Sequence, residues 1–152
     1  MIGTAVPHNP LPQDASDLAA DARRLLLDLD AHVPAAAGAS GECRPALDIV
    51  ETTAAIEVVA DVPGVPPEAL RVSIRRNTVL VVGVKLPGSL DADARFHIAE
   101  RSFGRFARAV RVGGAVDVSR ARAVVTGGQL RVVLPRIAEQ RGRVISVPVE
   151  RG

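Results

Sequence analysis

The chain has 152 residues, of which 47% are hydrophobic and 24% charged, a balance typical of a folded protein rather than a disordered one. This length suits one domain of ordinary size with flanking arms. The formal net charge of +2 is too small an excess to indicate polyanion binding by itself. Because the chain has no Trp, no Tyr and only three Phe, its core has to be aliphatic, and its many Val residues favour strands.

Cysteine content and the N-terminal sequence bear on the compartment. A single cysteine, Cys43, excludes an internal disulfide and suits a reducing environment. The first 14 residues lack the basic start and apolar run of a secretory signal. No stretch approaches the roughly 18 apolar residues that span a bilayer. We therefore expect a cytoplasmic protein without stable membrane insertion.

The first of three zones, residues 1–43, is an arm with one helical segment and an Ala/Gly/Ser linker at 34–41. Apolar residues recur in that segment at spacings of three and four, with aspartates between them, which predicts an amphipathic helix. We expect Ser16 to cap its N-terminus. An isolated helix of this length is marginal in water, so its stripe needs a partner surface. The stripe consists of Leu18, Ala22, Leu25, Leu29 and Val33.

The second zone, residues 44–136, is predicted to consist of short strands rich in Val or Ile and bounded by Pro, Gly, Asn or Asp. Val72 and Ile74 alternate with polar neighbours, so one face of that strand is expected to be buried and the other wet. Residues 76–78 and 126–128 carry tight-turn signals because Asn and Gly tolerate positive φ. Seven strands without intervening long helices predict an antiparallel, immunoglobulin-like β-sandwich. The predicted strands are Ala46–Val50, Ala55–Val62, Leu70–Arg75, Val79–Lys85, Arg105–Val112, Ala121–Thr126 and Gln129–Leu134.

The strand Arg105–Val112 places Arg108 on the same face as Phe106 and Val110. A guanidinium among apolar groups has to be hydrogen-bonded or ion-paired, so we expect Arg108 to hold a specific partner. Gly104, just before this strand, is expected to form a bend or bulge.

The third zone, residues 137–152, begins with polar residues and ends in the apolar segment 144–149. Residues two apart on an extended strand point the same way, so Val147 and Val149 can deliver two branched side chains to one groove. Such a peptide can add to a sheet edge or fill a slot in a neighbour's sandwich, and Pro148 lowers the ordering cost of docking. Ile145 and Val147 offer an alternative register.

Five separate stretches of the chain resemble the small heat-shock (alpha-crystallin) protein family. Residues 45–51 look like its opening strand, and residues 60–64 with 67–70 look like the turn that follows. The most specific stretch, residues 100–106 (Glu-Arg-Ser-Phe-Gly-Arg-Phe) with Arg108, is similar to the family signature. Residues 128–135 look like the closing strand, and the tail resembles the family's C-terminal motif. The stretches follow the family's order and spacing across about ninety residues.

The resemblance implies a homo-oligomer built from dimers, in which the loop 86–101 contributes a short strand to the partner subunit. It also implies that the tail occupies a groove in another subunit and that the helix stripe binds unfolding client proteins. The dimer-interface residues are expected to be Phe96, His97, Ile98 and Arg108. The tail residues are Ile145, Val147, Pro148 and Val149, and the accepting groove is formed by Val72, Ile74, Leu130 and Val132. The client-binding residues are Leu18, Leu25 and Leu29.

The resulting hypothesis is an ATP-independent holdase chaperone with no catalytic site, cofactor or metal. The three histidines, His8, His32 and His97, fall in different zones without a carboxylate or thiol at ligand spacing. Two alternatives remain open. Arg101, Arg105, Arg108 and Arg111 could serve an RNA-binding β-module, although stacking aromatics are few. A p23-like co-chaperone adaptor would share the sandwich but usually lacks such a tail.

Overall fold

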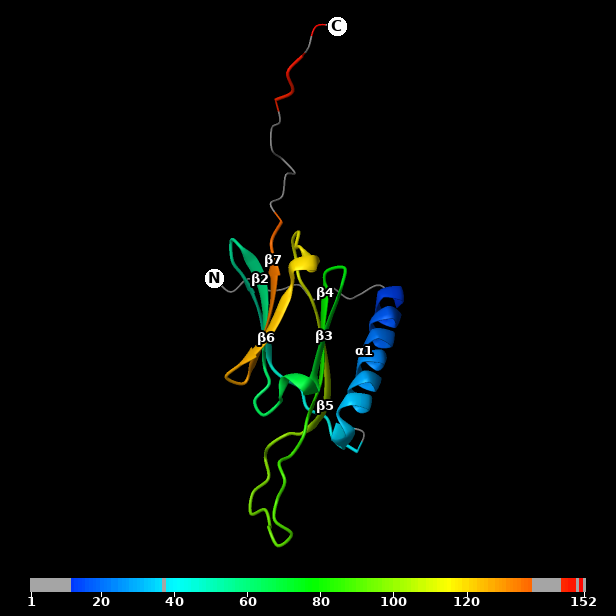
Figure 1. Cartoon of the computed structure of the whole chain (residues 1–152), viewed down its shortest axis with the longest axis vertical. Helices are drawn as coiled ribbons and strands as arrows, with labels where there is room; N and C mark the ends of the chain where they lie inside the picture. The colour runs from blue at the N-terminus through cyan, green and yellow to red at the C-terminus, as the bar shows by residue number, and fades with distance from the viewer. Residues whose placement is uncertain (1–11, 37, 138–145, 150, 152) are drawn as a thin grey trace.

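The computed structural model describes residues 12–36, 38–137, 146–149 and 151 as a two-sheet antiparallel sandwich with one long helix on its outer side (Figure 1). One sheet has the strand order β1-β2-β7-β6 and the other β3-β4-β5. The strands are β1 (Leu47–Glu51), β2 (Ala55–Asp61), β3 (Leu70–Arg75), β4 (Thr78–Lys85), β5 (Gly104–Arg111), β6 (Arg122–Thr126) and β7 (Gln129–Pro135). The predicted all-β sandwich is confirmed, and every strand bound lies within one residue of its predicted position.

Two tight turns connect neighbouring strands at the positions that the sequence indicates. In the β6–β7 turn, Gly127 and Gly128 have φ of 59° and 77°, as a two-residue turn with left-handed residues requires. In the β3–β4 turn, the residue with positive φ is Arg76, at 55°, rather than Asn77. The expectation that Asn would take this conformation is therefore wrong. Asn77 instead donates its side-chain amide to the Gly114 carbonyl, 3.0 Å away.

The core between the sheets is built from Val, Leu, Ile and Ala with a single aromatic ring, that of Phe106. Strand β7, and β2 from Ile56 onward, alternate between buried and more exposed residues. Val58 and Val132 therefore face inward while Glu57 and Arg131 form an ion pair on the outer face. Strand β4 differs because residues 79–84 are buried without interruption. A strand buried on both faces must be covered on its second face by another element.

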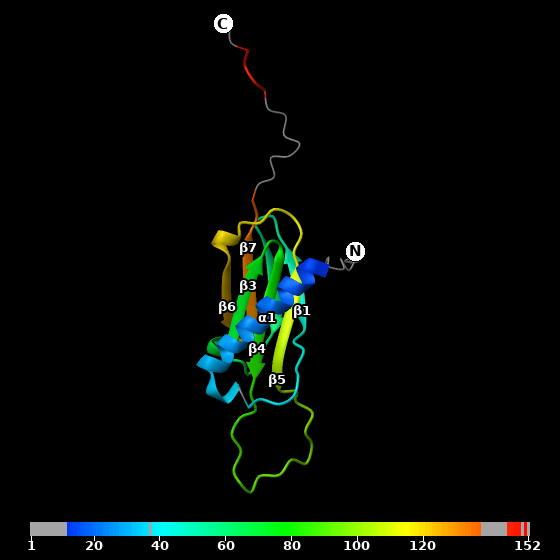
Figure 2. The same ribbon diagram turned by 90° about the vertical axis from the view of Figure 1, so that its right-hand side faces the viewer.

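That element is the helix α1 (Pro12–His32), which crosses the outer face of the β3-β4-β5 sheet (Figure 2). The predicted amphipathic helix is present, but it begins four residues before Ser16, so the expected cap at Ser16 is wrong. Pro12 is the first helical residue, where its fixed φ and missing N–H suit the start of a helix. A short 3₁₀ turn, η1 (Pro34–Ala36), follows and inserts Ala36 into the core.

The segment that links α1 to β1 is held against the start of β5. Gly41 and Gly104 approach so closely that a Cβ placed on Gly104 would lie 2.2 Å from the Gly41 carbonyl oxygen. Gly104 also has φ of 118°, a conformation that favours glycine. The predicted bend at Gly104 is therefore confirmed, and its role is to admit the backbone of this linker.

The loop between β4 and β5 projects from one end of the sandwich (Figure 1). It contains no strand, so the expected short strand at residues 96–98 is absent from the single chain. A strand needs a hydrogen-bonded neighbour, and none of the described segments pairs with this stretch.

Two further 3₁₀ turns are η2 (Pro67–Ala69) and η3 (Val118–Arg120). Across the described ranges, no helix is both long and apolar enough to cross a membrane.

Candidate functional site: apolar surfaces and their polar locks

The tail segment carries the most exposed large apolar side chains of the described chain. Val147 and Val149 are 77% and 98% exposed. Figure 1 shows residues 146–149, in red, clear of the sandwich. Ile145, the residue needed for the alternative register, lies outside the described residues. Both valines are therefore free to contact another chain, with Pro148 between them.

The four residues expected to accept the tail fall into two groups. Val72 and Ile74 of β3 are half-buried at the margin of the core. Leu130 and Val132 of β7 are only 2% and 1% exposed because β7 is an interior strand of its sheet, so they lie between the sheets rather than on an open surface. The half-buried residue that completes an apolar rim with β3 is Val125 of β6.

Edge position explains why Val125, rather than a β7 residue, borders the open side. Strands β3 and β6 are edge strands of their two sheets, and Figure 2 places them on the same side of the sandwich. The sequence carried only part of the signal for Val125, since it lies within a predicted strand but its neighbour Val124 is equally apolar. What it lacked was the strand order, which decides whether an inward-facing residue borders an edge.

The β4–β5 loop presents three exposed apolar side chains. Phe96 and Ile98 are 69% and 76% exposed, and Leu90 is similarly open. Being two residues apart, Phe96 and Ile98 would share a face if this stretch became extended. His97 between them is exposed. Within the part of the chain that the structure describes, nothing covers these side chains.

Arg108 lies on the inner face of β5, half-buried, and donates a short hydrogen bond to the Pro45 carbonyl oxygen. The prediction of a specific partner for Arg108 is confirmed. Burial lowers the pKa of the guanidinium, and the nearby positive charge of Arg44 lowers it further, although an arginine stays protonated. The bond joins β5 to the segment that leads into β1, which fixes the side of the sandwich opposite β3 and β6.

The helix stripe packs against its own sheet. Leu29 is 1% exposed and lies in a cluster with Leu80 and Val82, the outward-facing aliphatic residues of β4. Leu18 and Leu25 are half-buried in the same cluster. The partner surface that the stripe requires is therefore the outer face of the β3-β4-β5 sheet, and the three expected client-binding leucines are covered in this arrangement.

Ion pairs surround this apolar contact. Arg75 Nε lies 2.9 Å from Asp21 Oδ2, and Arg105 Nη2 lies 2.7 Å from Asp30 Oδ1. Asp21 is the only buried charged residue in the described part of the chain, with 6% of its surface exposed. Arg75 also lies 3.6 Å from a carboxylate oxygen of Asp17. The aspartates between the leucines of α1 thus pair with arginines of β3 and β5.

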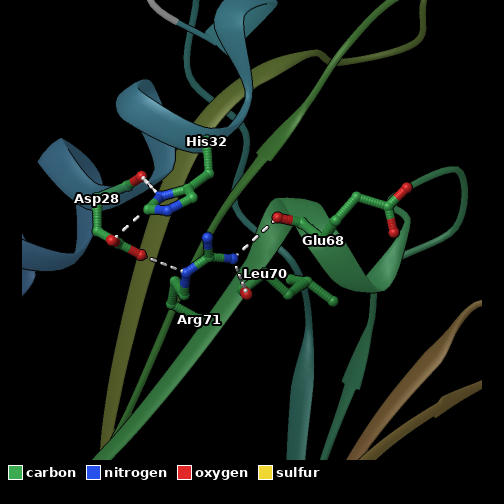
Figure 3. Close-up of polar contacts among 5 residues, drawn as sticks. All are labelled: Asp28, His32, Glu68, Leu70 and Arg71. Atoms are coloured by element: carbon green, nitrogen blue, oxygen red, sulfur yellow. Dashed lines mark hydrogen bonds and ion pairs between the residues drawn. The ribbon is translucent and has the colours of Figure 1, made fainter.

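The ion pair between Arg71 and Asp28, at the C-terminal end of α1, is supported by further hydrogen bonds (Figure 3). Arg71 donates from Nε to Asp28 Oδ2 at 2.6 Å and from Nη1 to the carbonyl oxygens of Glu68 and Leu70. His32 Nδ1 lies 3.2 Å from the other carboxylate oxygen of Asp28. The hydrogen bond from Arg71 lowers the pKa of the Asp28 carboxyl, with smaller contributions from the charges of His32 and Arg71, against a raising effect of burial.

Two kinds of alternative site find little support in the geometry. The four arginines considered for RNA binding do not all share a surface, because Arg108 points inward while Arg105 is paired with Asp30 on the outer face. Among the described residues, no group of three or more His, Cys, Asp or Glu side chains could hold a metal ion. Cys43 is half-buried with its thiol near the Gly104 carbonyl, and burial raises its pKa, which disfavours the reactive thiolate.

Comparison with known proteins gives a consistent result. A sequence model described as the Hsp20/alpha crystallin family matches residues 48–150. "Spore protein SP21" of Stigmatella aurantiaca is 34% identical over 103 residues, which are 68% of this chain and 61% of that protein. The "18.9 kDa heat shock protein" of Oryza sativa is 29% identical over 141 residues, covering 92% of this chain and 80% of the rice protein.

Solved structures share the sandwich. "Heat shock protein 16.0 from Schizosaccharomyces pombe" superposes with a TM-score of 0.58 at 26% identity, covering 70% of this chain and all, 100%, of that one. A small heat-shock protein from Xylella fastidiosa, whose structure is described as revealing "a distinct high order structure", gives a TM-score of 0.59 at 25% identity, covering 70% of this chain and 98% of that one.

Proposed function

Because the chain belongs to the Hsp20/alpha crystallin family of non-enzymatic chaperones, we propose that it is an ATP-independent holdase that works as a homo-oligomer built from dimers. One observation carries the proposal: large apolar side chains of the loop and the tail are exposed in the single chain. Exposed apolar groups at two separate extensions indicate contacts with other chains. Burial of such groups requires no nucleotide.

Assembly would use both extensions. The tail valines would fill the apolar rim between β3 and β6 of another subunit, formed by Val72, Ile74 and Val125. The loop stretch 96–98 would become a strand by pairing with an edge strand of the dimer partner. Strand β1 is the acceptor we favour, since it is an edge strand with exposed Ile49 and Val50. Arg108, bonded next to β1, would fix the geometry of that edge.

Client capture would follow from loosening these contacts. The stripe residues Leu18, Leu25 and Leu29 become accessible only when α1 leaves its sheet, because Leu29 is covered by Leu80 and Val82. Heat is expected to weaken this contact before it unfolds the sandwich, since α1 packs as an outer layer on one sheet and the main core lies between the two sheets. Freed stripes would then bind the apolar surface of unfolding proteins and block aggregation.

We also propose a cytoplasmic or other reducing location. The single cysteine supports it, because a half-buried thiol with a raised pKa is suited to remain reduced. One rice relative, at 33% identity, is described as a peroxisomal 16.0 kDa heat shock protein.

The test is suppression of aggregation of a heat-labile enzyme such as citrate synthase, followed by light scattering. We expect suppression at near-stoichiometric chain concentrations, unchanged by ATP and insensitive to salt between about 50 and 200 mM, a range over which nucleic-acid affinity falls steeply. Undiminished scattering at excess chaperone would contradict the holdase function. Tight, salt-sensitive binding of single-stranded RNA would favour the RNA-binding alternative instead.

A further inference from the structure

The outer face of the β3-β4-β5 sheet has the shape of a seat for a helix. In the strand register, Leu80 of β4 lies between Ser73 of β3 and Ala109 of β5, and Val82 lies between Arg71 and Ala107. Small side chains flank Leu80 on both strands and flank Val82 on the β5 side, so the large aliphatic side chains of β4 form a shallow apolar strip. A helix placed over this strip can contact the aliphatic residues, because the small side chains beside them do not hold it away from the sheet.

Positive charge borders the strip. Arg71 and Arg75 lie on β3, and Arg105 lies at the start of β5, all on the outer face with Leu80 and Val82. Asp21 and Asp28 of α1 are seven residues apart, which is about 10 Å along a helix, and Arg71 and Arg75 are four apart, about 13 Å along a strand. The two spacings match closely enough for both ion pairs to form at 2.9 and 2.6 Å.

These features do not depend on the rest of the α1 sequence. The contact uses an aliphatic stripe and aspartates on the same side of the helix, among which Asp21 and Asp28 are one heptad apart and Asp30 pairs with Arg105. The outward side of α1, which includes exposed Leu27, makes no part of it. Any acidic amphipathic helix with this spacing offers the same chemistry. Segments of that kind become exposed when helical proteins unfold.

The tether decides which helix occupies the seat at rest. Ala36 is buried in the core only four residues after α1 ends, and Cys43 N–H donates to the Arg105 carbonyl at 3.2 Å. A helix fixed so closely to its seat has an effective concentration of roughly millimolar. It therefore excludes dilute competitors until heat, or a locally high concentration of unfolded chains, shifts the balance.

We propose that the outer face of the β3-β4-β5 sheet is itself a client-docking site, selective for acidic amphipathic helices of unfolding proteins, and that α1 is its built-in competitor. This inference rests on the proposed holdase function and names the class of client segment that one surface takes. It differs from capture by the α1 stripe, since the sheet face, and not the helix, is the receptor. The arginines that border the strip, Arg71, Arg75 and Arg105, add selectivity for negative charge to the burial of apolar surface.

The experiment uses the full chain and a fluorescein-labelled synthetic helix that keeps the stripe and aspartate positions of α1 but has an unrelated sequence elsewhere. The variant Asp21→Lys with Asp28→Lys places lysines opposite Arg71 and Arg75, so α1 is repelled and the seat is vacated. Fluorescence anisotropy should show affinity for the acidic probe rising about tenfold or more over the unsubstituted chain.

A compensating variant tests whether the arginines that border the strip contribute to probe binding. Adding Arg71→Glu and Arg75→Glu to the lysine variant restores opposite charges in cis and repels the acidic probe, so affinity should return to the unsubstituted level or below. Arg122→Glu, on an exposed residue of β6, is the matched control and should change nothing. A probe with Ser at the positions of Leu25 and Leu29 should not bind any variant.

Four outcomes would overturn the inference. Equal probe affinity in all variants would exclude the seat as the site, and binding of a probe with the α1 sequence but not of the unrelated helix would assign the seat to a second copy of this chain. If the lysine variant suppressed citrate synthase aggregation yet bound no probe, the docking inference would fail while the holdase function stood. Probe binding without any suppression would instead overturn the holdase function, and with it clients as the occupants of the seat.

Discussion

The outer face of the β3-β4-β5 sheet and the two extensions, loop 86–101 and tail 146–149, treat apolar surface in opposite ways. On the sheet face, Leu80 and Val82 are covered by a helix of the same chain. On the extensions, Phe96, Ile98 and Val147 remain open. The difference teaches that this chain completes one apolar contact internally and leaves the apolar side chains of its extensions exposed.

Charge separates the two regions as clearly as burial does. Three arginines of the sheet pair with aspartates of α1 and so fix the helix in one position. Within the described ranges, no ion pair joins residues 87–98 or 146–149 to the sandwich. Contacts made by the extensions would therefore depend on apolar shape and backbone pairing, which suits surfaces that bind and release.

The largest expected effect comes from the loop. Phe96→Ser with Ile98→Ser removes the two side chains that would enter the partner subunit, so dimers should dissociate and the native mass should fall toward that of one 15.9 kDa chain. Size-exclusion chromatography with light scattering measures it. Leu90→Ser, in the same loop and also exposed, is the control and should leave the mass unchanged. A full-sized assembly formed by the double variant would remove the loop from the interface.

The tail should have the next largest effect. Val147→Ala with Val149→Ala deletes the branched groups that would fill the β3–β6 rim, so the assembly should shrink to small species such as dimers while the loop contact persists. The same mass measurement applies. Val124→Ala, which trims an exposed valine of β6, is the matched control. An unchanged mass would argue that the tail contributes no intersubunit contact.

A substitution in the contact between α1 and its sheet should weaken helix docking without changing the native mass, unlike the loop and tail variants. Leu29→Ala leaves a cavity against Leu80 and Val82 and should weaken helix docking by about 2 kcal/mol or more, as buried Leu→Ala changes do. Hydrogen exchange of residues 15–32 should accelerate while the native mass stays constant. Leu27→Ala, on the exposed side of the same helix turn, should change neither quantity. If Leu29→Ala instead dissociated the oligomer, the docking of α1 on its sheet would have to contribute to assembly together with the loop and the tail.

The strands could be predicted from the sequence because their signals are local. Alternation in β2, β3 and β7 and the Gly-Gly turn at 127–128 each depend on a few neighbouring residues. Arg108 was predictable as well, since a guanidinium on an apolar face must find a partner, although its acceptor, the Pro45 carbonyl, required the three-dimensional fold.

The seat of α1 was not predicted, although the sequence carried a signal for it. The alternation of Arg71, Ser73 and Arg75 was interpreted as a wet face, yet Arg71 and Arg75 pair with the helix. The uninterrupted run at 79–82 in β4 shows no alternation, which is typical of a strand covered on both faces. Combined with the orphan stripe of the helix, that run would have indicated which surface the helix covers.

The acceptor that we propose for the tail could not be located from local pattern. Leu130 and Val132 alternate like residues of a groove, but β7 lies inside its sheet and both are fully buried. Which strands form edges depends on long-range pairing, and no local periodicity reports it. The β3–β6 rim, with Val125, therefore emerges only from the strand order.

The smallest expected effect is a pH dependence that belongs to the covered face alone. Asp28 faces Arg71 and His32, and the hydrogen bond from Arg71 holds the pKa of its carboxyl below the ordinary value of 3.8. A depressed pKa in the docked state means that the ion pair stabilises docking fully above pH 3.8 and ceases to do so as the pH falls through the docked-state pKa. Helix docking, followed by hydrogen exchange of residues 15–32, should thus weaken only in that acidic window.

Asp28→Asn isolates this contribution from the other carboxylates of the helix. The variant should dock less well than the unsubstituted chain at neutral pH, because Arg71 loses a charged partner while keeping the Glu68 and Leu70 carbonyls. The two proteins should converge once Asp28 is protonated. If instead their difference persisted at the lowest pH, shape rather than charge would hold this end of α1, and the sheet face would lose the feature that most distinguishes it from the loop and the tail.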